Sequence, residues 1–275
     1  MTPRLGRADL HIHTLASDGT NGVIEILEYV EARTDLDVIA ITDHERIDAA
    51  IAARSIARDR GLRAEVVVGE EITTLGGHLL ALWIEAPVRP LRSLRQTIAE
   101  IHAQGGIAIP AHPLVPYPLC AQGFMLRRLL ADDERYRPDG LETFNPTTLG
   151  RPRHAQVVAF ADEFGLAKVG NSDAHALAAI GSGHTTFPGL TAADVRAAIE
   201  ARTSHHHGSF HATADQLGTF AEQLRKYGRD ARANVGARLG NGAGRDLGYP
   251  AEHGPGGARG AGDDGPANGG TGIRA

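Results

Sequence analysis

Short apolar runs alternate with stretches of helical periodicity from residue 8 to about residue 203. This alternation is typical of βα units, in which helices surround a parallel sheet. The expected strands are 8–13, 37–42, 64–71, 78–84, 106–111, 140–144 and 167–171. The expected helices are 22–33, 48–60, 91–103, 153–164 and 192–201. Seven strands in this order favour an α/β barrel over an open sheet with a single switch point.

The composition changes after residue 204, and the change predicts three segments. Residues 1–204 are expected to form one α/β domain and residues 205–239 a linker with a short helix near 213–227. The run His205-His206-His207 falls at the start of that linker. In residues 240–275 about one-third of the positions are glycine and almost none is a large apolar residue. Such a segment cannot bury enough surface to offset its ordering entropy, so we expect a disordered tail.

Charge and composition exclude several classes of protein. The chain of 275 residues has 28 basic and 33 acidic residues, a net charge of −5, so strong binding to duplex DNA is not expected. No apolar run approaches the length of about 18 residues that a membrane span needs, and no apolar segment follows the first arginines as in a secretory signal. The single cysteine, Cys120, forms no intrachain disulfide. These features favour a cytoplasmic protein, and they leave the oligomeric state open.

Imidazole and carboxylate side chains recur where the expected strands end. The first strand ends in His11-Ile12-His13, and residues i and i+2 of a strand share a face, so both imidazoles point into one site. In an α/β barrel the carboxyl ends of the strands lie together on the face that carries the chemistry. The other candidates near strand ends are Asp18, His44, Glu71, His78, His112, Asp173 and His175. This mixture of side chains suits Zn, Mn or Fe, so we expect a metal centre on that face.

The motif series HxH, SDG, TDH, GxE, HxL, AHP and SDAH, in this order, resembles that of the PHP (polymerase and histidinol phosphatase) family of metal-dependent phosphoesterases. The resemblance covers roughly residues 8–203. It implies a distorted (β/α)7 barrel with a trinuclear metal centre at the carboxyl ends of the strands. It also implies two to three divalent cations per chain, of Mn, Fe or Zn.

The same resemblance implies three sets of ligands. The first set is His11, His13, Glu71 and Asp173. The second set shares Glu71, which would bridge two ions, and adds His78 and His112. The third set is Asp18, His44 and His175, with Asp18 at a position where some relatives carry histidine.

The chemistry implied is hydrolysis of a phosphate ester by water that the cations activate, because a bound cation lowers the pKa of water toward ~7. His175, His44 and Asp173 are the catalytic candidates, and either histidine or a water molecule is expected to protonate the leaving oxygen.

Candidate substrate contacts lie in the loops that follow these strands. They are Asp43, Arg46, Arg151 and Arg153. An arginine fork suits a phosphate that stays on the product. All but two of the 28 basic residues are arginine, however, so an arginine in any given loop can equally be a solvated surface residue. Asp43 either orients His44 or meets substrate.

Short single-domain members of the family resemble enzymes that act on nucleotides or short oligonucleotides, such as 3′,5′-nucleoside bisphosphate phosphatases and 5′–3′ exonucleases. The expected partner is therefore a small phosphorylated substrate of this kind. A histidinol-phosphate-type phosphatase, a metal-dependent amidohydrolase and a non-catalytic PHP binding module remain as alternatives. An amidohydrolase that opens with HxH commonly needs a carbamylated lysine in a middle strand, and neither Lys168 nor Lys226 ends one. A non-catalytic module tends to lose ligands, whereas every expected position here carries a competent side chain.

Overall fold

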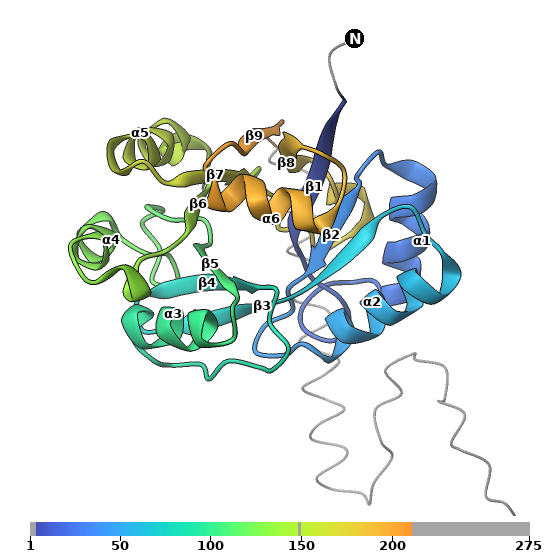
Figure 1. Ribbon diagram of the computed structural model, residues 1–275, viewed down its shortest axis with the longest axis horizontal. Helices are drawn as coiled ribbons and strands as arrows, with labels where there is room; N and C mark the ends of the chain where they lie inside the picture. The colour runs from blue at the N-terminus through green and yellow to red at the C-terminus, as the bar shows by residue number, and fades with distance from the viewer. Residues whose placement is uncertain (1–3, 148–149, 211–275) are drawn as a thin grey trace, which may run out of the picture.

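The computed structural model describes residues 4–147 and 150–210 (Figure 1). Its strands are β1 (Leu5–Ile12), β2 (Val38–Ile41), β3 (Glu65–Thr74), β4 (Gly77–Leu82), β5 (Ile107–Pro110), β6 (Gly140–Phe144), β7 (Ala167–Gly170), β8 (Gly183–Pro188) and β9 (His205–Gly208). Its α-helices are α1 (Val23–Arg33), α2 (Asp48–Arg60), α3 (Leu94–Ala103), α4 (Gly123–Leu130), α5 (His154–Phe164) and α6 (Ala192–Glu200). The tail expected at 240–275 and the helix expected at 213–227 lie outside the described residues.

The predicted α/β class is confirmed, and the sheet is curled into an irregular barrel. Seven strands are hydrogen-bonded in the order β5-β4-β3-β2-β1-β8-β9, and β6 and β7 form a separate parallel pair. The strands β1, β2 and β3 run parallel, whereas β4 pairs antiparallel with both β3 and β5. Backbone hydrogen bonds between Ala174 and the residues His11 and His13 bring the segment after β7 against the end of β1. The carboxyl ends of β1, β2 and β3 therefore face the same side as the end of β7.

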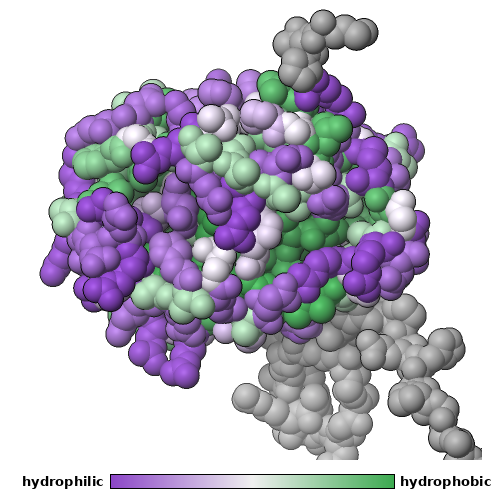
Figure 2. Space-filling model, viewed as in Figure 1, coloured by the Kyte–Doolittle hydropathy of each residue, from purple (hydrophilic) through white to green (hydrophobic). Residues whose placement is uncertain are grey.

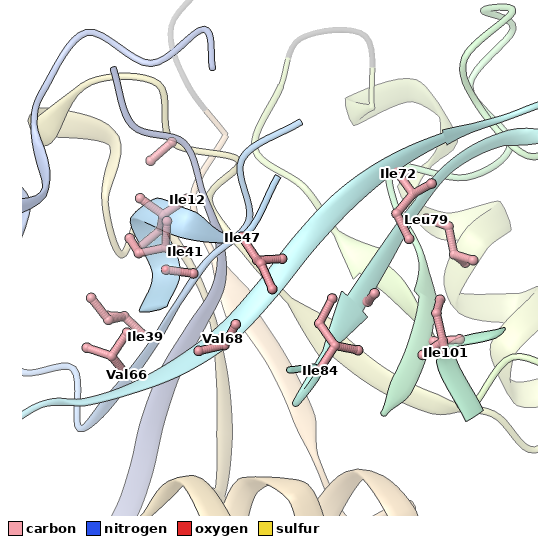
Figure 3. Packing of buried hydrophobic residues seen from close by; sticks show 14 of the residues in the cluster. Ile12, Ile39, Ile41, Ile47, Val66, Val68, Ile72, Leu79, Ile84 and Ile101 are labelled. Atoms are coloured by element: carbon pink, nitrogen blue, oxygen red, sulfur yellow. The ribbon is translucent and has the colours of Figure 1, made fainter. Parts of the chain in front are cut away.

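Two apolar clusters hold the barrel together because alternate residues of a strand face opposite sides. On β2, Ile39 and Ile41 belong to the outer cluster between the sheet and the helices, which Figure 3 shows, whereas Val38 and Ala40 belong to the inner cluster. The helix α6 also contributes to the inner cluster, and in Figure 1 it crosses in front of the strands. Each fully buried isoleucine or leucine side chain contributes about 1.5–3 kcal/mol.

The surface is mostly polar. Hydrophilic side chains cover most of the face seen in Figure 2, with apolar side chains gathered toward its middle. Within residues 4–147 and 150–210, no helix has both the length and the apolar character needed to cross a bilayer.

The strand β9 lies where the sequence predicts the start of a linker. It pairs antiparallel with β8, from His205 opposite Thr186 to Gly208 opposite Gly183. His206 is the reason that this polar run packs: Nδ1 lies 2.9 Å from Oγ1 of Thr143, and burial lowers the pKa of the ring to about 4. The folded domain therefore continues beyond residue 204, and a run of histidines gave no apolar pattern from which to predict it.

Candidate metal centre

Nine side chains gather at one side of the barrel, and they are the nine that the sequence predicts as metal ligands. They come from β1, β3 and β4 and from the loops that follow β1, β2, β5 and β7. Their ligand atoms form four groups, and within each group all atoms lie within 4.8 Å of one another. The groups are His11 with His13 and Asp173, His13 with Asp18 and His175, His13 with His44 and Glu71, and Glu71 with His78 and His112.

Glu71 is the central carboxylate of this cluster. Its Oε2 lies 3.2 Å from Nε2 of His11 and 3.2 Å from Nε2 of His13. Its Oε1 lies 2.9 Å from Nδ1 of His78 and 3.1 Å from Nε2 of His112. The two oxygens thus face two different pairs of imidazoles, which is the arrangement that a carboxylate shared between two ligand groups requires.

The antiparallel strand β4 explains how His78 reaches this position. His78 lies near the start of β4, opposite Thr73 near the end of β3. The β3–β4 hairpin therefore brings the first residues of β4 to the same side as the carboxyl end of β3. The register of this hairpin therefore places His78 beside Glu71, with Nδ1 of His78 2.9 Å from Oε1 of Glu71.

Two aspartates complete the cluster at its outer edge. Oδ1 of Asp173 lies 3.4 Å from Nε2 of both His11 and His13. Oδ2 of Asp18 lies 3.0 Å from Nε2 of His175 and 3.8 Å from Nε2 of His44. Asp173 adopts the left-handed conformation with φ of 52°, which aspartate tolerates better than most residues and which turns the chain sharply after β7.

The exposure of the ligands defines a closed end and an open edge. The side chains of His11 and His13 are fully buried, whereas those of His44, His175 and His112 are 23%, 16% and 15% exposed. A small molecule therefore approaches the cluster where these three rings reach the surface, and His44 is the most exposed of them.

The local backbone around β1 is adapted to the cluster. The register between β1 and β2 shifts between Asp9 and Ile12, a bulge of the kind that redirects side chains at sites. In the loop that follows, a Cβ atom on Gly19 would lie 2.4 Å from the carbonyl oxygen of His13, so only glycine fits there. The bulge and the tight loop together direct both imidazoles and Asp18 toward one centre.

Asp43 holds this loop and does not face the open edge. It is 1% exposed, and its carboxylate accepts hydrogen bonds from the backbone N–H and the hydroxyl of Thr14, both at 2.7 Å, and from the hydroxyl of Ser17. The prediction that Asp43 meets substrate therefore disagrees with its position. None of these hydrogen bonds reaches the ring of His44. The structural role of Asp43 is therefore to hold the loop that carries Asp18 in place.

Burial and opposite charges act against each other throughout the cluster. Burial disfavours ionisation of Glu71, but the imidazoles of His11 and His44 outweigh burial and hold the pKa of Glu71 well below its usual value. Burial also opposes protonation of His13, but Asp173 and Glu71 raise its pKa to about 10. Without a cation the imidazole of His13 is therefore protonated near neutral pH, so a metal ion and a proton compete for its ring nitrogen.

Unsatisfied nitrogen atoms show that the cluster fits a divalent cation. Nε2 of His11, Nε2 of His13 and Nδ1 of His78 are buried and lie 2.9–3.2 Å from oxygens of Glu71, yet none of them forms a hydrogen bond within the described part of the chain. A buried polar atom left in this state costs about 1–3 kcal/mol. Bound cations would satisfy these nitrogens, and the set of imidazole and carboxylate ligands suits Zn, Mn or Fe.

Further polar groups surround the ligands, and the sequence missed two of them. Glu142 on β6 accepts a hydrogen bond from Nδ1 of His11 at 2.9 Å. Asp9 on β1 accepts hydrogen bonds from the backbone N–H of Ser172 at 3.0 Å and from its hydroxyl at 2.5 Å, beside Asp173. Both carboxylates lie within apolar strands, where burial without a partner is costly. A carboxylate within an apolar strand is therefore the sequence signal by which Glu142 and Asp9 could have been found.

The single cysteine also contacts a ligand. Cys120 is 5% exposed, more deeply buried than its sequence neighbours indicate, and its Sγ lies 3.2 Å from Nδ1 of His112. The contact leaves Nε2 of His112 facing Glu71.

The three candidate arginines make contacts outside the ligand cluster. Arg46 forms a two-pronged ion pair with Asp48, at 2.7 and 2.6 Å, and donates to the carbonyl of Ala16 at 2.9 Å. Arg153 donates to the side chain of Gln156 at 2.8 Å, and the Arg151 guanidinium lies 5.5 Å from the ring centre of Phe210. Arg46 is the one that these contacts place beside the loop carrying Asp18.

Comparison with known sequences yields a partial family match and one relative. A family model described as PHP-associated matches residues 152–204. An uncharacterised protein of Methanocaldococcus jannaschii is 34% identical over 121 residues, which span 40% of this chain and 69% of that protein.

Solved structures share the fold at low sequence identity. A two-domain protein from Bacteroides vulgatus, described as containing a predicted PHP-like metal-dependent phosphoesterase, has a TM-score of 0.61 and 20% identity, over 80% of this chain and 70% of that one. A proposed metal-dependent phosphoesterase from Bifidobacterium adolescentis has a TM-score of 0.55 and 18% identity, over 73% and 97%. An amidohydrolase from Chromobacterium violaceum has a TM-score of 0.53 and 18% identity, over 76% and 99%. The motif series, the family match and the shared fold lead to one conclusion: this chain belongs to the PHP domain family.

Proposed function

We propose that this protein is a metal-dependent hydrolase of phosphate esters. The observation that carries the proposal is the position of Glu71, whose two oxygens face two separate pairs of imidazoles in a cluster of nine potential ligands. A carboxylate that lies between two sets of ligands can hold two cations close enough together to act on one phosphoryl group. The structural similarity to phosphoesterases supports the same class.

Bound divalent cations lower the pKa of water toward ~7 and neutralise charge that develops on a phosphoryl group. The side chains of the cluster set the net charge of the site and limit its access to water. Six neutral imidazoles and three carboxylates carry a formal charge of −3, and the buried carboxylate of Glu142 behind His11 brings the total to −4. Two divalent cations would balance this charge and a third would leave the site positive, which would attract a phosphate. His11 and His13 at the buried end exclude bulk water, and the open edge admits the substrate.

Among the catalytic candidates, His44 is the one best placed to exchange a proton with a leaving oxygen. Its side chain is more exposed than that of His175. Nδ1 of His175 donates to the backbone carbonyl of Asp173 at 2.9 Å, and its Nε2 lies 3.0 Å from Oδ2 of Asp18, so both ring nitrogens are engaged. His175 therefore acts as a fixed ligand, and Asp173 is the carboxylate of the group that contains His11 and His13.

For the substrate we propose a nucleotide or a short oligonucleotide, with two to three Mn, Fe or Zn ions bound. Support for a second phosphate contact comes from Arg46, which lies beside the open edge, where it forms an ion pair with the half-exposed Asp48 and donates a hydrogen bond to the carbonyl of Ala16. Exposed ion pairs contribute about 0–1 kcal/mol, so a phosphate dianion can displace Asp48 from the guanidinium. A small phosphate such as histidinol phosphate is the second candidate, since the metal centre itself does not distinguish the two.

The lysine needed by an amidohydrolase of the HxH type has no counterpart in the cluster. Nζ of Lys168 lies 2.7 Å from Asp162 on the surface, and Lys226 lies outside the described residues. A purely binding function is disfavoured because all nine ligand positions are filled by side chains that converge.

The test is a hydrolysis screen on protein that has been stripped with a chelator and then reloaded with Mn²⁺. The substrates are a nucleoside 3′,5′-bisphosphate, a 5′-phosphorylated oligonucleotide, histidinol phosphate and an N-acyl amino acid as the amide control. We expect release of phosphate or nucleotide only in the reloaded protein. Cleavage of the amide alone would contradict the proposal, and so would activity that survives chelation.

A further inference from the structure

Glu142 lies in the middle of β6, with its side chain inside the barrel and 1% of its surface exposed. Four hydrogen bonds use both of its oxygens. Oε1 accepts from Nδ1 of His11 and from Nδ2 of Asn171, both at 2.9 Å. Oε2 accepts from the backbone N–H of His112 at 2.7 Å and from Nδ2 of Asn145 at 3.0 Å. This carboxylate is therefore fully satisfied, although no cation of a lysine or arginine pairs with it in these contacts.

Three of these four hydrogen bonds lead to expected metal ligands, which lie on or after three different strands. Glu142 holds His11 of β1 through its ring and His112, after β5, through its backbone. It reaches Asp173, after β7, through Asn145, whose Nδ2 also lies 3.3 Å from Oδ2 of Asp173. One side chain thus connects ligands that are up to 162 positions apart in sequence.

Each contact has a specific consequence for its ligand. Because Nδ1 of His11 donates to Glu142, the proton is fixed on Nδ1, and Nε2 is left free toward Glu71 and Asp173. A carboxylate behind an imidazole also raises the basicity of the ligating nitrogen. His112 has a φ of 31°, a left-handed conformation that costs of order 1–3 kcal/mol, and the bond from its N–H to Glu142 holds the chain there.

The position requires a carboxylate and not merely a polar residue. All four partners of Glu142 are donors, and a carboxylate has only acceptors. A glutamine of the same shape would turn its NH₂ group toward two N–H donors in either orientation. The substitution Glu142→Gln therefore changes hydrogen bonding and charge but hardly changes volume.

We infer that Glu142 is a positioning residue that sets the metal affinity of the centre by orienting His11, His112 and Asp173 together. This inference rests on the proposed function, because it assumes that these residues bind metal. Nothing in the mechanism needs Glu142 to touch substrate or the reacting atoms.

The experiment measures binding of Mn²⁺ to the metal-stripped full-length chain by calorimetry, and it follows unfolding of each metal-free protein separately. For Glu142→Gln we expect a Kd for Mn²⁺ that is ~10–100-fold higher, the usual effect of removing a partner behind a ligand. The matched control is Thr143→Val, the adjacent buried residue of β6, whose hydroxyl bonds to Val169 and His206 on the other side of the strand. We expect this control to lower the melting temperature and to leave the Kd within about twofold.

A second variant keeps the inference testable if Glu142→Gln does not fold. Asn145→Ala removes one donor of Glu142 and the link to Asp173 but keeps the carboxylate, so a smaller rise in Kd is expected. An unchanged Kd in a folded Glu142→Gln protein, or in Asn145→Ala if only that variant folds, would overturn the inference. An equal rise in the Kd for Mn²⁺ in Thr143→Val would also overturn the inference, because it would show that any weakening of β6 is enough to lower metal affinity. If the wild-type chain binds no Mn²⁺, the proposed function fails first and this inference fails with it.

Discussion

Glu71→Gln is the substitution with the largest expected effect on turnover. The amide keeps one acceptor oxygen and points its NH₂ group either at the nitrogens of His11 and His13 or at those of His78 and His112. In either orientation one ligand group meets a donor instead of an anion. The group containing His78 and His112 has no other carboxylate among its members, so it is the more vulnerable of the two.

The size of the fall in kcat follows from the fact that Glu71 is shared by two ligand groups, so one substitution disturbs both. Changing a partner behind a ligand usually costs ~10–100-fold, and a shared ligand between two groups must cost more. We expect kcat to fall by ~10³ or more, which corresponds to about 4 kcal/mol of lost transition-state stabilisation. Hydrolysis of the best substrate is measured at saturating Mn²⁺, with metal content determined in parallel.

The neighbouring glutamate provides a matched control. Glu70 faces the opposite side of β3, where its carboxylate accepts from the backbone N–H of Val88 at 2.8 Å. Burial raises the pKa of Glu70 to about 7, so near neutrality a large share of it already carries the proton that makes it resemble glutamine. Glu70→Gln should therefore leave turnover near the wild-type value. If Glu71→Gln kept more than a tenth of wild-type turnover with full metal content, the shared-ligand assignment would be wrong.

Three further outcomes are expected. Asp173→Asn should lower kcat by ~10³, and Asp43→Asn, which only loosens the loop carrying Asp18, by ~10–100-fold; equal losses in a steady-state assay would contradict this order. Arg46→Ala should raise KM for a nucleotide bisphosphate several-fold and hardly change KM for p-nitrophenyl phosphate, whereas equal changes would remove Arg46 from the substrate contacts. The pKa of His13 is raised from 6.5 to about 10, so the stability that its protonation gives the metal-free chain is present below pH 6.5 and is lost as the pH rises toward 10. The melting temperature of the metal-free chain should therefore fall over that range, and bound Mn²⁺ should remove this dependence. A metal-free chain that is more stable at high pH would contradict this prediction.

The parts of the fold that were predictable are those with a strong apolar period. Strands β1 to β7 and five of the six α-helices lie where the pattern placed them, because each buries an apolar face. The helix α4 and the strands β8 and β9 were missed for different reasons. The strand β8 is a mostly polar run that is held by antiparallel pairing with β1 and β9. The helix α4 is short, and β9 is a run of histidines held by its pairing with β8 and by contacts of His206.

The expected metal ligands of the candidate site were predictable because they belong to sequence motifs. The residues that hydrogen-bond to those ligands were less predictable. All nine expected ligands converge, since strand ends of a barrel share one side. Glu142 was missed because nothing in its sequence neighbourhood shows that it meets His11 and His112, which are remote in the chain. Asp43 was placed near substrate, but its hydrogen-bonding capacity is used by Thr14 and Ser17, a pairing that depends on the shape of the loop after β1.

The β3–β4 hairpin makes one half of the centre local and leaves the other half dependent on the whole chain. Glu71 and His78 are seven positions apart and meet within a single hairpin, whereas His11 and Asp173 are 162 positions apart and meet only when β7 closes on β1. Contacts between remote segments require a long loop to be closed, at a larger entropic cost than contacts within a hairpin. The contact of Glu71 with His78 requires only the β3–β4 hairpin, whereas the contact of His11 with Asp173 requires the segment after β7 to pack against β1. His11 and Asp173 would hold a cation only while these two remote segments stay together, so metal bound by them would be lost when the segment after β7 separates from β1.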